Sequence, residues 1–325
     1  MSSVNLHERI VRYGELKPCK TAFIDAHTPG SDAKENFTII GAGVSESADQ
    51  HVHIADTPGF NIGAAGQPPK CRNSLHTHTT AEVFFVLSGR WRFFWGRNGD
   101  AGEVVLEEGD LINVPTHMFR GFENTGTNYG MIMAVLGGDD AGGGVVWAPQ
   151  VIEEAGNHGL ILGDNGVLYD SKKGESLPQG ISPMPVLSSE QVAELQEPKA
   201  AEVVPRFVAR YWDMMAMASD QPVPVLAADG MLKDKPGFEI DLISRTSISN
   251  TRYSTERHEI LMVMRGHWLL SWDYNNTTQE TVLTPGDVCA VPPGVARSLE
   301  VSMSGEASMF RVRNTDDPAG ATHWL

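Results

Sequence analysis

The chain has 325 residues, of which 41% are hydrophobic and 20% charged, and its formal net charge is −16. This acidic balance argues against nucleic acid and anionic membranes as partners, because both attract a basic face. The three cysteines are widely spaced and odd in number, which predicts no disulfide framework and fits a reducing compartment. We find no signal peptide pattern at the start and no apolar run near the roughly 18 residues of a membrane span. We therefore expect a cytoplasmic protein.

Short apolar runs alternate with glycine-containing turns over the first half of the chain. Several such strands separated by turns are typical of a barrel or jelly roll. The dipeptide Ser88-Gly89 indicates a turn, and a two-residue hairpin loop is one form that this turn could take. That hairpin would place three aromatic residues on the side of the histidines described below, where they either line a pocket or fill the core: Trp91, Phe93 and Trp95. The expected strands cover residues 37–40, 49–54, 83–87, 103–106, 111–114, 118–122 and 129–136.

Two histidines and a glutamate stand at even spacing in the middle of this region. If His76, His78 and Glu82 belong to one strand, their side chains share a face, because successive residues of a strand alternate. Two imidazoles and a carboxylate form a donor set suited to Fe(II), Mn(II), Ni(II), Zn(II) or Cu(II). The alternative is a pair of solvated histidines beside a salt-bridged glutamate.

The residues around this cluster resemble the two sequence motifs of the cupin superfamily. His76-x-His78, three residues, Glu82, six residues and Gly89 resemble the first motif. The second motif is matched by three residues, namely Gly109, Pro115 and Asn124. It departs from the family at His117, where glycine is usual, and at Arg120, where the family has its fourth metal ligand, a histidine. The resemblance implies an all-β jelly-roll barrel.

The pattern of the first barrel returns 177 residues later. The shared offset relates seven pairs: Glu82 and Glu259, Gly89 and Gly266, Trp91 and Trp268, Trp95 and Trp272, Gly109 and Gly286, Pro115 and Pro292, and Arg120 and Arg297. Such a repeat indicates a tandem duplication. We therefore predict a bicupin, with one barrel in residues 1–140 and a second in 236–325. Residues 141–235 would join them as a partly helical segment, with a capping box from Ser188 to Gln191.

The second barrel keeps the glutamate but not the histidines. At the same offset, Tyr253 and Thr255 stand opposite His76 and His78, so we expect no metal site there. Both barrels do retain a glutamate and an arginine, and such a pair could form a buried salt bridge where no metal binds.

The donor set of the first barrel resembles the facial triad of non-haem Fe(II) oxygenases, which leaves coordination positions open for substrate and O₂. We expect one divalent metal ion per chain, with Fe(II) favoured and Mn, Ni, Zn or Cu compatible. A distant similarity to gentisate-type ring-cleaving dioxygenases implies a dioxygenase for a small organic acid, aromatic acids included. Arg120 would orient the anionic substrate through two parallel N–H···O bonds.

Two other functions fit the same residues. One is a non-redox lyase or isomerase that uses the metal ion as a Lewis acid. The other is a metal-free binding or structural bicupin with a Glu82–Arg120 ion pair. By analogy with the family we also expect a homodimer or a larger homo-oligomer.

Overall fold

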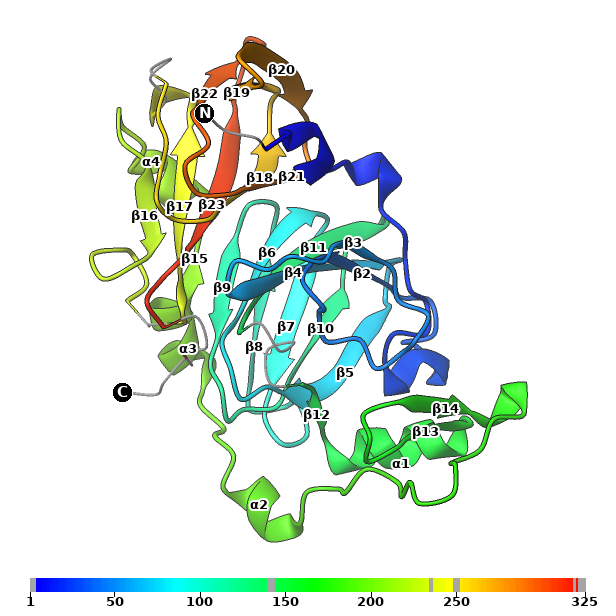
Figure 1. Cartoon of the computed structure of the whole chain (residues 1–325). Helices are drawn as coiled ribbons and strands as arrows, with labels where there is room; N and C mark the ends of the chain where they lie inside the picture. Colours follow the sequence, from blue (N-terminus) through cyan, green and yellow to red (C-terminus); the bar gives the residue numbers. More distant parts are fainter. Residues whose placement is uncertain (1–3, 139–143, 234–235, 248–251, 318–319, 321–325) are drawn as a thin grey trace.

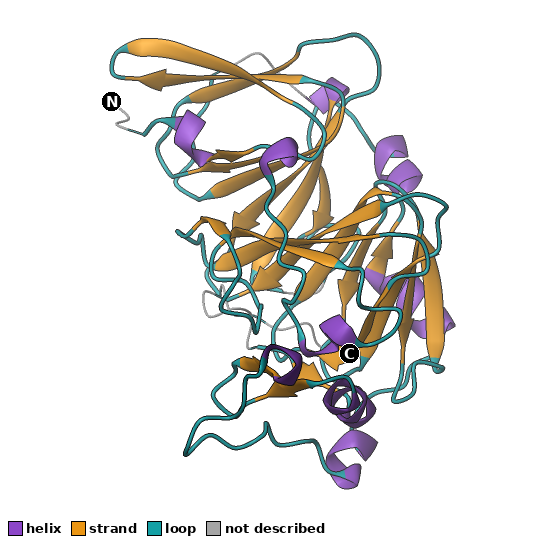
Figure 2. Cartoon of the chain, turned by 90° about the vertical axis from the view of Figure 1, so that its right-hand side faces the viewer, coloured by secondary structure: helices purple, strands orange, loops and turns teal. Residues whose placement is uncertain are grey.

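The computed structural model describes residues 4–138, 144–233, 236–247, 252–317 and 320. Its strands form two barrels that lie one above the other in Figure 1, the first in blue to green and the second in yellow to red. The helices lie at the periphery of the strands (Figure 2). Within the described residues, no helix is both long and apolar enough to cross a membrane.

Two sheets make up the first barrel. The larger has the order β15-β9-β6-β11-β4-β2-β3, with bounds Val208–Ala209, Leu111–Val114, Glu82–Ser88, Gly130–Gly137, Phe60–Gln67, Glu35–Ile40 and Val52–Ile54. The smaller has the order β12-β5-β10-β7-β8, with bounds Val146–Trp147, Arg72–Thr77, Arg120–Asn124, Trp91–Trp95 and Gly102–Leu106. Apolar side chains from both sheets fill most of the space between them.

The second barrel repeats this plan with fewer strands. Its larger sheet has the order β1-β21-β18-β23-β17-β16, with bounds Ile10–Val11, Val288–Val291, Glu259–Arg265, Ser308–Asn314, Phe238–Ser244 and Val223–Leu226. Its smaller sheet has the order β20-β19-β22, with bounds Thr277–Leu283, Trp268–Tyr274 and Arg297–Val301. The predicted all-β fold of two tandem barrels is therefore confirmed.

The segment between the barrels carries the longer helices. These are α1 (Pro149–Asn157), α2 (Ser189–Ala193), α3 (Ala200–Phe207) and α4 (Tyr211–Ala216), with a small ribbon of β13 (Leu160–Leu162) and β14 (Leu168–Asp170) after α1. Helix α2 begins with the predicted capping box, in which the Ser188 side chain accepts a bond from the backbone N–H of Gln191.

The larger sheets of the two barrels pack against each other. Phe85 of β6 lies against Phe310 of β23, with ring centroids 4.9 Å apart, and Phe60 of β4 lies 5.5 Å from Phe238 of β17. These aromatic rings belong to one buried cluster that contains residues of both barrels. Because aromatic burial is among the largest contributions to packing, we expect the barrels to behave as one unit.

Each barrel also receives a short arm from the segment that precedes the other. Ile10 of β1 pairs with Cys289 in the second barrel, and Val208 of β15 pairs with Ile112 in the first. An arginine follows each arm and binds a buried aspartate of the receiving barrel at 2.7 Å, as Arg12 with Asp287 and Arg210 with Asp110. The N-terminal arm thus lies on the second barrel, although it belongs to the segment assigned to the first.

The hairpin predicted at Ser88-Gly89 is wrong. Strand β6 pairs with β9 and β11, whereas β7 pairs with β8 and β10, so the chain crosses from one sheet to the other at this turn. Gly89 permits the crossing with a φ of 89°, which side-chain-bearing residues rarely adopt. The aromatic residues of β7 are buried in the core, as in the second interpretation of their role.

Candidate metal centre

The three predicted ligands meet inside the first barrel, although they do not share a strand. His76 lies near the end of β5, Glu82 opens β6, and His78 lies in the turn between the two strands. They converge because the chain passes there from one sheet to the other. One potential ligand atom from each lies within 4.8 Å of the others, and all three residues are buried. Among the described residues, no other group of three or more such side chains is close enough to hold a metal ion.

Both imidazole rings are oriented by backbone carbonyls. The Nδ1 atom of His76 lies 2.8 Å from the carbonyl oxygen of Ser74, and Nδ1 of His78 lies against the carbonyl oxygen of Gly144. With Nδ1 as the donor, the lone pair of each ring resides on Nε2, which is the arrangement of most metal-binding histidines. Burial, reinforced by Arg120 and His78, lowers the pKa of His76 well below its usual value, so this ring is neutral and able to bind a cation.

Arg120 lies beside Glu82 and holds one of its two oxygens. Its Nε donates to Oε2 at 3.1 Å, its Nη2 donates to the same oxygen, and its Nη1 donates to the carbonyl oxygen of His76 at 3.1 Å. The other carboxylate oxygen, Oε1, lies 3.4 Å from Nε2 of His78. Burial alone would raise the pKa of Glu82, but Arg120 and the histidines outweigh it and hold the pKa below its usual range. Glu82 is therefore a carboxylate.

A small cavity adjoins the three ligands. Its volume is about 70 Å³, and all three ligands line it. The apolar and aromatic residues of its wall are Ala22, Phe23, Phe37, Val44, Ala64, Ala65, Phe84, Phe122, Ala134, Leu136, Val145 and Trp147. Arg120 is not one of the residues that line the cavity, and neither are Trp91, Phe93 and Trp95. The substrate-orienting role of Arg120 stays a prediction.

A buried charge pair supports the ligand strand from behind. Lys34, with a fully buried side chain, binds Asp25 and also donates to the Oδ1 of Asn73 at 2.9 Å. Asp25 accepts the backbone N–H of Ser74, whose carbonyl oxygen in turn receives Nδ1 of His76. This pair was not predicted from the sequence, because it comes from a segment without a regular apolar pattern.

Trp147 of β12 covers His76, with ring centroids 5.3 Å apart. Its indole N–H donates to Glu46 at 2.6 Å, and the second oxygen of Glu46 accepts the backbone N–H of Ile24 at 2.9 Å. Burial raises the pKa of Glu46 to about 8 despite these two bonds. Glu46 thus joins two segments that cover the cavity.

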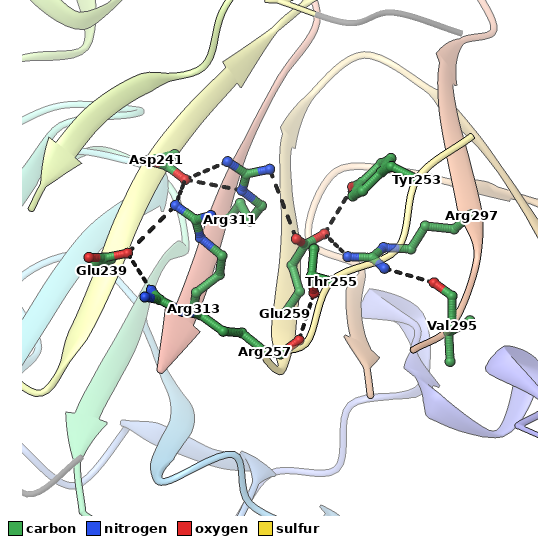
Figure 3. A network of polar contacts seen from close by, with 10 residues as sticks. All are labelled: Glu239, Asp241, Tyr253, Thr255, Arg257, Glu259, Val295, Arg297, Arg311 and Arg313. Carbon is green, nitrogen blue, oxygen red and sulfur yellow. Dashed lines mark hydrogen bonds and ion pairs between the residues drawn. The ribbon is translucent and has the colours of Figure 1, made fainter. Parts of the chain in front are cut away.

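In the second barrel, the corresponding positions bind one another (Figure 3). Tyr253 donates to Oε1 of Glu259 at 3.0 Å, and Nη2 of Arg297 lies 2.8 Å from the same oxygen. The guanidinium of Arg297 also lies over the Tyr253 ring, 4.4 Å from its centroid. Thr255 hydrogen-bonds to the carbonyl oxygen of Arg257 instead of joining this group. The glutamate–arginine pair predicted for both barrels is present in both.

Charged side chains occupy the place of the cavity in the second barrel. Strand pairing joins Ala134 to Gly63 in the first barrel and Arg311 to Asp241 at the corresponding place in the second. The guanidinium of Arg311 donates to Asp241 at 2.7 and 3.1 Å and lies 3.9 Å from Glu259 (Figure 3). The two barrels therefore share a backbone plan and differ in what fills the space beside the glutamate.

Comparison with known proteins agrees with this architecture. Residues 66–136 match the family described as "Cupin domain". No curated protein matches the sequence. Among solved structures, the Lactobacillus farciminis oxalate decarboxylase is 12% identical with a TM-score of 0.57, over 100% of this chain and 90% of that one. Procruciferin, an 11S globulin from Brassica napus, is also 12% identical with a TM-score of 0.55, over 93% of this chain and 84% of the other.

The first barrel therefore contains a cupin domain, and the chain as a whole has the two-barrel, bicupin fold of these solved structures. At these identities the solved structures establish the fold and leave the activity open. One of the two residues that depart from the second motif, His117, has a φ of 57°, and its counterpart Gly294 has a φ of 77°. The position thus keeps the left-handed backbone that explains why glycine is usual there.

Proposed function

We propose that the first barrel is a metal-dependent enzyme site that holds one divalent ion through His76, His78 and Glu82. The observation that carries this proposal is the convergence of the three donor groups within 4.8 Å. Both histidines present Nε2, and Glu82 offers Oε1 because Arg120 occupies Oε2. Isolated buried histidines would not need this common orientation, whereas metal ligands do.

The bound ion would supply Lewis acidity, and with iron it would also allow chemistry with O₂. Three protein ligands leave coordination positions for a substrate carboxylate and for O₂, which supports the dioxygenase as the first candidate. The remaining residues have simpler tasks. Arg120 keeps Glu82 ionised and directs one oxygen towards the histidines, while Trp147 and the apolar wall exclude water from the cavity.

The size of the cavity favours the smaller organic acids over aromatic ones. An engineered protein cavity that accepts a benzene ring has a volume of roughly 150 Å³. The volume here is about 70 Å³. An aromatic acid would therefore require the covering segments to move apart. The oxalate decarboxylases among the solved structures of similar fold also support a small acid as the substrate. They favour a lyase reaction as the alternative to the dioxygenase.

A second candidate function is a binding or structural bicupin without a metal ion. It is favoured by one specific observation, the buried ion pair of Glu82 and Arg120, which already neutralises the carboxylate. The vicilin from Capsicum annuum and the 11S globulin among the similar folds support the same candidate.

Oxygen consumption separates these candidates. Protein loaded with Fe(II) without air would be mixed with oxygenated buffer and a panel that includes formate, acetate, glycolate, oxalate and benzoate. The dioxygenase proposal expects one acid to raise O₂ uptake, and the His76→Ala variant to abolish that increase. Product formation without O₂ uptake would favour the lyase. A protein that takes up no metal would favour the binding function.

A further inference from the structure

One wall of the cavity contains two neighbouring small residues, Ala134 and Gly63. Ala134 of β11 pairs with Gly63 of β4 on one side and with Phe84 of β6 on the other, and all three residues line the cavity. At Gly63 even a methyl group would be tight, because a Cβ there would lie 3.2 Å from the carbonyl oxygen of Phe37. These three paired residues form a row across the sheet. The open volume beside the candidate metal ligands therefore depends on the size of the side chains in this row.

The second barrel shows what happens when the positions of Ala134 and Gly63 carry large side chains. Arg311 replaces Ala134, Asp241 replaces Gly63, and Leu261 replaces Phe84, according to the pairing of the corresponding strands. The guanidinium of Arg311 lies between Asp241 and Glu259 and binds both carboxylates. Within one chain, the same backbone arrangement thus leaves a cavity beside this row in the first barrel, whereas side chains fill the corresponding space in the second barrel.

The residues in the rest of the cavity wall limit which classes of ligand the cavity can bind. Among the described residues that line the cavity there is no lysine or arginine, so a negative group would have to bind at the metal ion. Beyond the ligands the wall is largely apolar, with Phe84, Phe122 and Leu136. Burial of a second charged group against this wall would be costly without a partner. An acid with a carboxylate head and a short apolar remainder fits this combination.

We propose that Ala134 is a specificity-determining residue that limits the ligand to short-chain carboxylates of about six non-hydrogen atoms. This limit follows because a water molecule occupies at least roughly 10–15 Å³ of such a volume, and the cavity measures about 70 Å³. The inference rests on the proposed function, because it takes the carboxylate to bind the metal ion. It goes beyond that function by naming the ligand class and the residue that sets its length.

The test measures the binding of carboxylates of increasing chain length. It compares the wild type with variants in which the side chain at position 134 is larger or smaller. Formate, acetate, propionate, butyrate, hexanoate and benzoate would be titrated by calorimetry into protein loaded with Co(II), with metal content measured for each variant. In the wild type we expect binding up to butyrate and none with benzoate. Ala134→Val should weaken propionate and butyrate at least 10-fold and leave formate unchanged. Ala134→Gly should extend binding towards hexanoate.

Val135→Ile is the matched control. Val135 is the next residue of β11, faces the core between the two larger sheets and does not line the cavity. The control should leave the whole series unchanged. If Ala134→Val keeps its metal ion and still binds butyrate like the wild type, the inference is wrong. Tight binding of benzoate by the wild type would also overturn it.

A metal-independent measurement separates this inference from the proposed function. Xenon enters apolar protein cavities without any metal ion. Xenon NMR on the metal-free protein should show binding in the wild type and in Val135→Ile, and little in Ala134→Val. If the wild type binds no metal ion but xenon follows this order, the proposed function fails while the role of Ala134 in setting the cavity size stands. Equal xenon binding by all three proteins would refute that role.

Discussion

Arg120 donates two hydrogen bonds to a single oxygen of Glu82, Oε2, and so leaves Oε1 facing the histidines. In related proteins the position of Arg120 supplies a fourth metal ligand, which a guanidinium cannot do because it has no free lone pair. The arginine instead fixes the rotamer and the charge of the ligand that remains. The first barrel thus presents three candidate metal ligands, His76, His78 and Glu82, with an arginine as the partner of the carboxylate.

The first prediction concerns Arg120→Lys. A lysine keeps the charge, but its single nitrogen cannot reproduce the three bonds to Glu82 and the His76 carbonyl. We expect the free energy of unfolding to fall by about 2 kcal/mol, and metal affinity to fall roughly 10- to 100-fold, as for other residues that orient metal ligands. Urea denaturation and competition with a chelator would measure the two effects.

The matched control is Arg297→Lys, which makes the same change beside Glu259 in the second barrel. It should destabilise the protein and leave metal affinity unchanged. If Arg120→Lys keeps both metal affinity and stability but weakens substrate binding, then Arg120 orients the substrate, as the sequence analysis predicted.

The second prediction concerns the ion network of the second barrel. Arg311→Met should lower the free energy of unfolding by about 1.5–3 kcal/mol, because Asp241 loses two charge-assisted hydrogen bonds and keeps only the one from Arg313 at 2.9 Å. The exposed fractions of the Arg311 and Asp241 side chains are only 14% and 7%. Arg252→Met is the control, since Arg252 pairs with Asp273 at the surface, where ion pairs contribute at most about 1 kcal/mol. Equal effects of the two substitutions would mean that the network is not important for stability.

The third prediction is a pH dependence that arises from Glu46. Burial raises its pKa from 4.5 to about 8 in the folded state. The folded state therefore binds the proton more tightly than the unfolded state, and this contribution to stability is full below pH 4.5 and lost as the pH rises to about 8. Between pH 5 and pH 8, the wild type should lose more stability than Glu46→Gln, whose side chain does not titrate.

Urea denaturation at several pH values would compare the two proteins, with Glu190→Gln as a control at a fully exposed glutamate. Parallel curves for the wild type and Glu46→Gln would show that Glu46 is ionised in the folded protein at all these pH values.

The repeat was the part of the fold that the sequence predicted best. The offset of 177 depends on residues that a barrel needs locally, such as the turn glycines Gly109 and Gly286, with φ of 88° and 87°. The exchanged arms were missed, although Ile10-Val11-Arg12-Tyr13 resembles Val208-Ala209-Arg210-Tyr211. The arms pair across the two barrels, so their separation differs from 177, and four residues are too few to be recognised without that pairing.

The convergence of the three candidate ligands was predicted for a partly wrong reason. Even spacing on one strand predicted that His76, His78 and Glu82 converge, whereas the actual cause is a crossing between two sheets. The filled row of the second barrel could not be predicted, because the size of Arg311 matters only once strand pairing places it opposite Asp241. A sequence pattern indicates which residues share one face of one strand, whereas the shape of a cavity depends on side chains from several strands.

The most direct test of the account is the metal content of each chain. Protein expressed without a chelating tag would be saturated in turn with Fe(II), Mn(II), Co(II), Ni(II) and Zn(II), desalted and measured by mass spectrometry of the elements. We predict one ion per chain, none in His76→Ala, and one in Tyr253→Phe, which alters the corresponding position of the second barrel. No bound ion with any of these metals, or an ion that survives His76→Ala and is lost in Tyr253→Phe, would contradict the account.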